Sequence, residues 1–184
     1  YALCIVEDPE EKNLLFLGTD DGLYISMDAG IKWEKWGHDF PTVSVKDLVI
    51  QERENDLVIG TFGRAAWVLD DITPLRVMAN NNEVLSSKIK LFKAPTAYLA
   101  AYQQPTGSRF GADAIFNGDN KEYGARIMFY FTKNETNEEL TEDKALLKTG
   151  AHKDSIYLKI YDKDRLIRNL KRKVPDSTGV YKWR

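Results

Sequence analysis

Short apolar runs separated by polar turns dominate the first half of the chain, and part of this pattern repeats. The segment NLLFLGT at residues 13–19 returns as NDLVIGT at residues 55–61, a shift of 42 positions. Each copy is followed by a turn containing Asp or Gly and then by a second apolar run, at 23–25 and at 66–68. Each copy is also preceded by an apolar run, and residues 33–36 add a fourth run to the first unit. The pattern predicts three or four short antiparallel strands in each unit.

A meander of short strands that returns every 42 residues is typical of a β-propeller blade. A propeller closes with roughly four to eight blades, so two units predict a fragment of a larger propeller. The second unit breaks off at residues 70–74, where Pro74 cannot donate to a strand ladder, and this predicts the last blade. We therefore predict an all-β fold whose first domain, residues 1–76, consists of two blades.

The second half of the chain has a different organisation. Residues 77–111 are rich in Asn, Pro and Gly and are predicted to form a connector with one edge strand, at 89–92. Alternating apolar runs return after it, at 123–131, 156–161, 166–170 and 179–183. They predict a small immunoglobulin-like β-sandwich over residues 112–184, truncated at its end. Residues 136–139 (TNEE) have capping-box spacing and predict a short helix before Gly150.

Charge supports two units with different surfaces. The 184 residues have a net charge of −2, but residues 1–76 hold 7 Lys+Arg against 15 Asp+Glu, a net of −8, and residues 77–184 hold 19 against 13, a net of +6. These opposed charges and the bare face of an incomplete propeller, with Leu15, Leu17, Leu57 and Ile59, predict self-association of the fragment.

Composition also restricts the chemistry. Apolar runs fall far short of the ~20 residues of a membrane-spanning helix, so no membrane span is predicted. The single cysteine, Cys4, excludes an internal disulfide and is predicted to be a buried small hydrophobe. His38 and His152 have no ligand-type spacing around them, so we predict no metal and no cofactor.

One motif in the first unit is specific. Residues 26–33, SMDAGIKW, match S-x-D-x-G-x-x-W, and each fixed residue has a mechanical reason. Ser26 can bond locally, Asp28 can accept backbone N–H groups within a tight turn, Gly30 can take a positive φ, and Trp33 can fold its indole under the hairpin. This structural role predicts that Trp33 is mostly buried.

This motif is the Asp-box, and with it residues 1–76 resemble the Asp-box (BNR) β-propellers. Residues 56–76 resemble the closing blade of the sortilin-like branch, found in large secreted bacterial proteins that are often labelled glycosyl hydrolases. In that branch His-Gly-Arg usually follows Gly-Thr, whereas this chain has Phe62-Gly-Arg64. Residues 88–131 resemble the connector and immunoglobulin-like domain that follow such propellers. The resemblance implies a secreted, periplasmic or cell-surface location.

Carboxylates are the first candidates for catalysis. The Asp-box occurs in sialidases, but the resemblance implies a fold-stabilising turn on the rim, away from the substrate, so Asp28 is assigned no catalytic role. The pairs Asp20-Asp21 and Asp70-Asp71 have the residue type of a glycosidase pair or a calcium site. Adjacent residues on a strand point to opposite faces, so we interpret both pairs as turn carboxylates and predict no catalytic residue.

Cations are the second candidates. Arg64 is predicted to have a structural role, such as bracing Asp70. Residues 163–173 carry six Lys and Arg, a pattern that could bind a polyanion, but Leu166, Ile167 and Leu170 are expected to be buried strand positions. We therefore predict a solvated edge strand and turn, and no nucleic-acid partner. Residues 134–136 fit the N-glycosylation sequon, which has little weight in a bacterial protein.

The sequence thus favours a non-catalytic scaffold, or the protein- or glycan-binding portion of a larger secreted Asp-box propeller protein. The alternative is a fragment of a secreted glycoside hydrolase whose catalytic residues lie upstream. A third, weaker hypothesis is adhesion to an anionic polymer through the C-terminal half.

Overall fold

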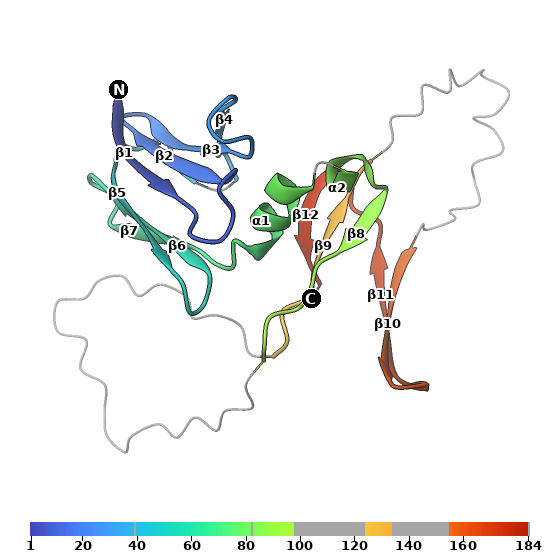
Figure 1. The fold of residues 1–184 in the computed structure, drawn as a ribbon. Helices are drawn as coiled ribbons and strands as arrows, with labels where there is room; N and C mark the ends of the chain where they lie inside the picture. Colours follow the sequence, from blue (N-terminus) through green and yellow to red (C-terminus); the bar gives the residue numbers. More distant parts are fainter. Residues whose placement is uncertain (39, 82, 98–123, 134–154, 184) are drawn as a thin grey trace, which may run out of the picture.

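The computed structural model describes residues 1–38, 40–81, 83–97, 124–133 and 155–183. They form mostly antiparallel β-sheet, as predicted, arranged as several small sheets (Figure 1). The first is a four-stranded meander of β1 (Ala2–Glu7), β2 (Leu15–Thr19), β3 (Gly22–Ser26) and β4 (Glu34–Lys35), in the order β1-β2-β3-β4. The strands predicted in the first unit are therefore present.

The second sheet has three strands, in the order β5-β6-β7: β5 (Val45–Gln51), β6 (Asp56–Thr61) and β7 (Ala66–Leu69). The chain then turns into α1 (Thr73–Asn80) and the short α2 (Glu83–Ser86), where the sequence predicted the end of the second blade, up to residue 76, and then a connector. Pro74 explains why the end of the strand ladder was predicted correctly and why the helix was missed. It cannot continue a strand ladder, but in the first turn of a helix its missing N–H is tolerated and its φ is already helical.

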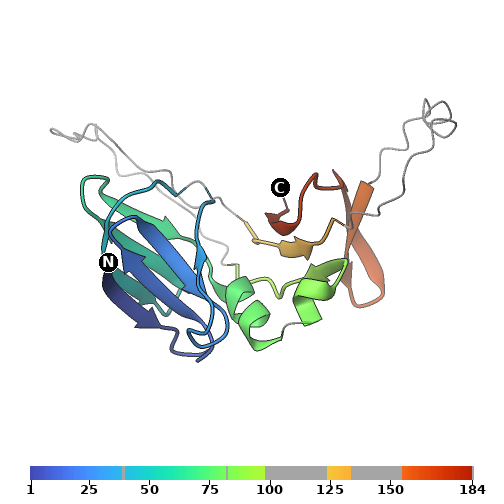
Figure 2. The same ribbon diagram turned by 90° about the horizontal axis from the view of Figure 1, so that it is seen from above.

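The first two sheets lie against each other and enclose the main core, with β5 beside β1 and β2 (Figures 1 and 2). The first sheet contributes Phe16, Leu23 and Ile25 to this core, all almost fully buried. The second contributes Val45, Leu57 and Ile59. The sequence-based prediction that Leu57 and Ile59 form a bare face is therefore wrong.

Cys4 and Gly18 lie at the centre of this contact. Cys4 is half-buried rather than buried and packs against the core, and burial raises the pKa of its thiol. Gly18 on β2 faces the same way, towards Val45 of the second sheet. The two sheets therefore approach most closely where β1, β2 and β5 meet.

The C-terminal part contains the predicted strands in two further sheets. β8 (Ile89–Leu91), β9 (Met128–Phe131) and β12 (Gly179–Lys182) form a sheet in the order β12-β9-β8. β10 (Ser155–Asp162) and β11 (Arg165–Lys173) form a long hairpin. Phe129, Phe131 and Trp183 make a second buried cluster between them. The helix predicted near residues 136–147 lies outside the described residues.

The burial predicted for the hairpin is wrong at two positions. Leu166 and Ile167 are 48% and 55% exposed, although both were expected to be buried. Adjacent strand residues face opposite sides, so the two could not both be buried in a regular strand. A β-bulge in the register, at Ile160 and Tyr161 of β10, also places Leu166 on the same side as its partner Tyr161. Leu170 beyond the bulge is half-buried against the second cluster.

Candidate functional site

The Asp-box turn, residues 26–33, connects β3 to β4 and is closed by its own polar groups. The Ser26 hydroxyl donates to Asp28 Oδ1 at 2.9 Å and accepts the Gly30 N–H at 2.8 Å. Asp28 Oδ1 also accepts the Lys32 N–H at 2.8 Å. Gly30 has a φ of 89°, which favours glycine, and lies beside Trp33. Trp33 is of intermediate burial, and its indole lies against the turn at Gly30.

These contacts engage the Asp28 carboxylate in the turn. The N–H of Lys32, the contact with Ser26 and the N–H of Ile31 together hold the pKa of Asp28 below its usual range, against the smaller opposing effect of desolvation. A carboxylate that accepts several donors of its own loop is a poor proton donor at neutral pH.

We expect Asp28→Ala to lower the midpoint of thermal unfolding at neutral pH, because the Lys32 N–H and the Ser26 hydroxyl lose their acceptor. The folded-state pKa is depressed, so this stabilisation is present above the unfolded pKa of about 3.9 and is lost as the pH falls through the folded pKa. The gap between parent and variant should therefore close in acid. Asp176→Ala, at an exposed carboxylate, is the control. A gap that persists unchanged at low pH would contradict this role.

Asp20 and Asp21 are engaged by separate local partners. Asp20 pairs with the α-amino group of Tyr1 at 2.6 Å. Asp21 pairs with the Lys35 ammonium at 2.9 Å and accepts the Thr19 hydroxyl at 2.7 Å, and these two contacts lower its pKa. Asp21 therefore ties the β2–β3 turn to strand β4, whereas Asp20 contacts the first residue, next to β1.

Asp71 differs from the other turn carboxylates because it is buried. It has a φ of 57°, its N–H donates to Asp56 Oδ1 at 3.0 Å, and its Oδ1 accepts the Thr73 N–H at 3.2 Å. Its Oδ2 is buried without a hydrogen-bond partner among the described residues. Asp70 next to it is exposed, so the two carboxylates lie in different environments.

The exposed residues singled out by sequence lie away from the core. Arg64 is exposed in the β6–β7 turn, where its carbonyl accepts the Trp67 indole N–H at 3.1 Å. Phe62 in the same turn is 72% exposed. His38 is exposed, and its ring makes an edge contact with Trp36 at 4.8 Å between centroids. His152 and the sequon at 134–136 lie outside the described residues.

The strongest electrostatic feature was not found from sequence: a buried ion pair between Asp8 and Arg76. Asp8 follows β1 and Arg76 lies in α1, and their side chains are 0% and 8% exposed. Arg76 Nε donates to both Asp8 oxygens, at 3.0 and 2.9 Å. Its Nη2 lies 2.9 Å from Asp8 Oδ2, off the direction of a hydrogen bond. The pair joins the first sheet to the helix.

Two more residues complete this network. Arg76 Nη1 donates to Asn55 Oδ1 at 2.6 Å, just before β6, and pairs with Glu10 at 2.9 Å. Asp8 Oδ1 also accepts the N–H groups of Glu10 and Glu11, at 3.0 and 2.8 Å, and so closes its own turn. The network therefore ties both sheets to α1.

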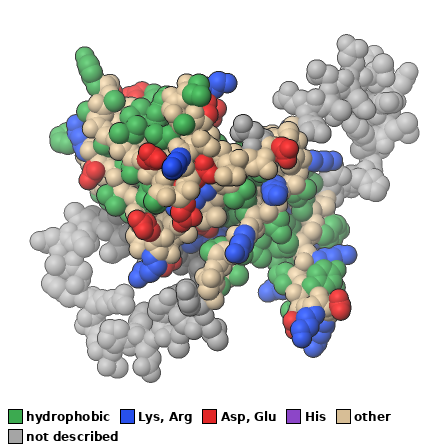
Figure 3. Space-filling view, viewed as in Figure 1, with side chains coloured by type: hydrophobic (Ala, Val, Ile, Leu, Met, Phe, Trp, Pro, Cys, Tyr) green, Lys and Arg blue, Asp and Glu red, His purple; other side chains and the backbone are tan. Residues whose placement is uncertain are grey.

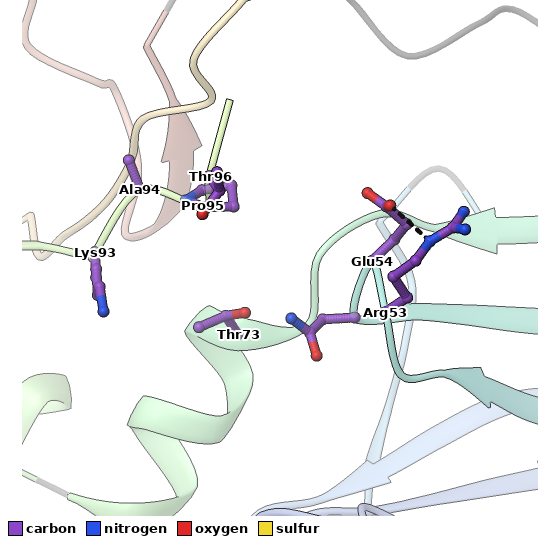
Figure 4. A pocket seen from close by; sticks show the side chains of 8 residues that line it. Arg53, Glu54, Thr73, Lys93, Ala94, Pro95 and Thr96 are labelled. Carbon is purple, nitrogen blue, oxygen red and sulfur yellow. Dashed lines mark hydrogen bonds and ion pairs between the residues drawn. The ribbon is translucent and has the colours of Figure 1, made fainter. Parts of the chain in front are cut away.

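Asn55 also lines a cleft of about 570 Å³. Figure 4 shows this cleft from close by. The cleft lies between the β5–β6 turn, the start of α1 and the segment after β8, and is lined by Arg53, Glu54, Asn55, Thr73, Lys93, Ala94, Pro95 and Thr96. Glu54, its one carboxylate, pairs with Arg53 at 3.1 Å. The cleft offers two cations, an amide and two hydroxyl groups for binding, and none of the described contacts of its lining residues joins a nucleophile to a base.

The described residues contain no cluster of three or more His, Cys, Asp or Glu that could hold a metal ion. They also contain no helix long and apolar enough to cross a membrane. Comparisons with protein-family models, with curated proteins and with solved structures find no match to this chain.

Proposed function

We propose that this chain is a non-catalytic scaffold, or the protein- or glycan-binding portion, of a larger secreted Asp-box β-propeller protein. In this proposal residues 1–76 form two consecutive blades and the C-terminal strands belong to an immunoglobulin-like sandwich. Secretion to the periplasm, the cell surface or the medium belongs to the same proposal.

The observation that carries it is how the repeated positions pack. Leu15 and Leu17 correspond in the 42-residue repeat to Leu57 and Ile59. Leu57 and Ile59 lie on the face of the second sheet that is buried against the first sheet. Leu15 and Leu17, in contrast, lie on the face of the first sheet that points away from the second sheet. The sheets therefore stack front to back, as successive blades do, and not face to face as in a symmetrical sandwich.

The stack also has apolar side chains at both ends. Ile5 of β1, cross-strand from Leu17, is 60% exposed, and Val49 and Val68 of the second sheet are each 55% exposed. Blades bury both faces against neighbours, so exposed apolar faces at both ends support an incomplete set of blades. Self-association through these faces stays a prediction.

An assay of glycoside hydrolysis tests whether this chain is catalytic. We expect no hydrolysis of chromogenic glycosides above background, because the turn carboxylates are engaged in local hydrogen bonds and ion pairs. The measurement is release of the chromophore by the full chain at several pH values. Turnover that is lost on changing Asp20, Asp21, Asp70 or Asp71 would place catalytic carboxylates in this chain and refute this proposal.

A further inference from the structure

The β10–β11 hairpin has two distinct faces. One packs against the second buried cluster through Ile156, Leu158 and Leu170. On the same face the Arg172 guanidinium lies over the rings of Phe129 and Tyr181, with its carbon 5.7 and 5.6 Å from the ring centroids, and donates to the Lys182 carbonyl. The hairpin is thus fixed to the neighbouring sheet, and its other face, called here the outer face, points away from the cluster.

The outer face has a regular composition. The cross-strand pairs that form it are Tyr157 with Lys171, Lys159 with Asn169, and Tyr161 with Leu166. Both tyrosines are 54% exposed, and Lys159, Asn169 and Lys171 are exposed as well. The two tyrosines are four positions apart along β10, which places them about 13 Å from each other.

Charge gives this face a preferred partner. Residues 155–173 contain seven Lys and Arg against two Asp, a net charge of +5. Both acids, Asp162 and Asp164, lie near the turn, and the charged side chains of the cross-strand pairs that form the outer face are two lysines, Lys159 and Lys171. Figure 3 shows Lys and Arg side chains along the hairpin, which runs to the lower right of the view.

We propose that the outer face of the β10–β11 hairpin binds an acidic polysaccharide, a polymer of uronic acid units. The proposal rests on the non-catalytic binding function above and names a ligand class and a site for it. The tyrosine rings pack against the apolar faces of sugar rings, since aromatic faces carry a partial negative charge that attracts C–H groups. Lys159 and Lys171 pair with carboxylates, and the Asn169 amide donates to and accepts from hydroxyl groups.

A nucleic-acid strand fits this face less well. Aromatic platforms for single-stranded nucleic acids lie within a positively charged groove that follows the backbone. The outer face is the open side of a two-stranded ribbon, and the exposed aliphatic side chains of Leu166 and Ile167 lie at one end of it.

The experiment measures binding of the full chain to polygalacturonate by calorimetry at low and moderate salt, with dextran as a neutral polymer and poly(U) as a nucleic acid. We expect binding to polygalacturonate that weakens with salt, and no binding to dextran. The double variant Tyr157→Ala, Tyr161→Ala should bind at least about tenfold more weakly, and Lys159→Gln, Lys171→Gln similarly, with a reduced salt dependence. Circular dichroism establishes that each variant is folded.

Matched controls place the same changes elsewhere on the surface. Phe62→Ala removes an exposed ring of the β6–β7 turn, and Lys46→Gln a lysine of β5; both should bind as the parent does. Tyr157→Phe keeps the ring and should also bind normally. Absence of binding, tighter binding to poly(U), or equal loss in the controls would each overturn the inference. Glycoside turnover is measured separately, so failure of this site is distinguishable from failure of the proposed non-catalytic function.

Discussion

Arg76→Met is expected to lower the free energy of unfolding by about 3–5 kcal/mol, the cost of breaking a buried ion pair by removing one partner. The change leaves the Asp8 carboxylate, fully buried in the parent, without its guanidinium. It also takes the donor from Asn55, so the contact between the helix and the second sheet weakens as well. Urea unfolding of parent and variant, followed by fluorescence, measures the difference.

The control for this change is Arg53→Met, at an arginine whose side chain is 81% exposed and pairs only with its neighbour Glu54 in the described residues. We expect its effect to stay within about 0.5 kcal/mol. Adding Asp8→Asn to Arg76→Met should restore part of the loss, since Asn is neutral and its oxygen can still accept the Glu10 and Glu11 N–H groups. If the double variant were less stable than Arg76→Met alone, the unpaired charge would not be the cause.

The position of this network explains what sequence could and could not predict. Strands were predictable because their apolar runs and turns are local patterns, and the Asp-box turn because its hydrogen bonds span at most four residues. Asp8 and Arg76 are 68 residues apart, and neither sits in a motif that points to the other. That Arg76 is buried and paired can be recognised only when α1 is placed against the first two sheets.

It was also difficult to predict which side of each strand is buried. The alternation in β2 and β6 is clear, but which side meets a neighbour depends on how the sheets stack, so Leu57 and Ile59 were assigned to the wrong environment. In the hairpin a bulge in the register places Leu166 on the same exposed side as its partner Tyr161. Composition alone placed the basic residues on a solvated strand, whereas their arrangement beside two tyrosines depends on the cross-strand register.

The two glycines of the repeat should respond differently to the same substitution. Gly18 and Gly60 occupy equivalent positions in the Gly-Thr pairs that end β2 and β6. A Cβ on Gly18 would lie 2.4 Å from Cys4 Sγ and 2.6 Å from Val45 Cγ1, because β1 and β5 both approach it closely. At Gly60 the nearest atoms, those of Asp47, would be 3.6 Å away, an ordinary contact.

We therefore expect Gly18→Ala to lower the free energy of unfolding by about 1–3 kcal/mol, as overpacking does in a closely packed core. Gly60→Ala should be neutral or slightly stabilising, since the unfolded chain loses backbone freedom and the folded strand has room for the methyl group. Chemical denaturation of both variants in parallel gives the comparison. Combining Gly18→Ala with Cys4→Ala removes the sulfur that the new methyl group meets and should recover part of the loss, whereas the contact with Val45 remains. Equal effects of the two glycine substitutions would mean that the sheets are not packed through Gly18, and the front-to-back stacking on which the blade proposal rests would then lose its closest contact.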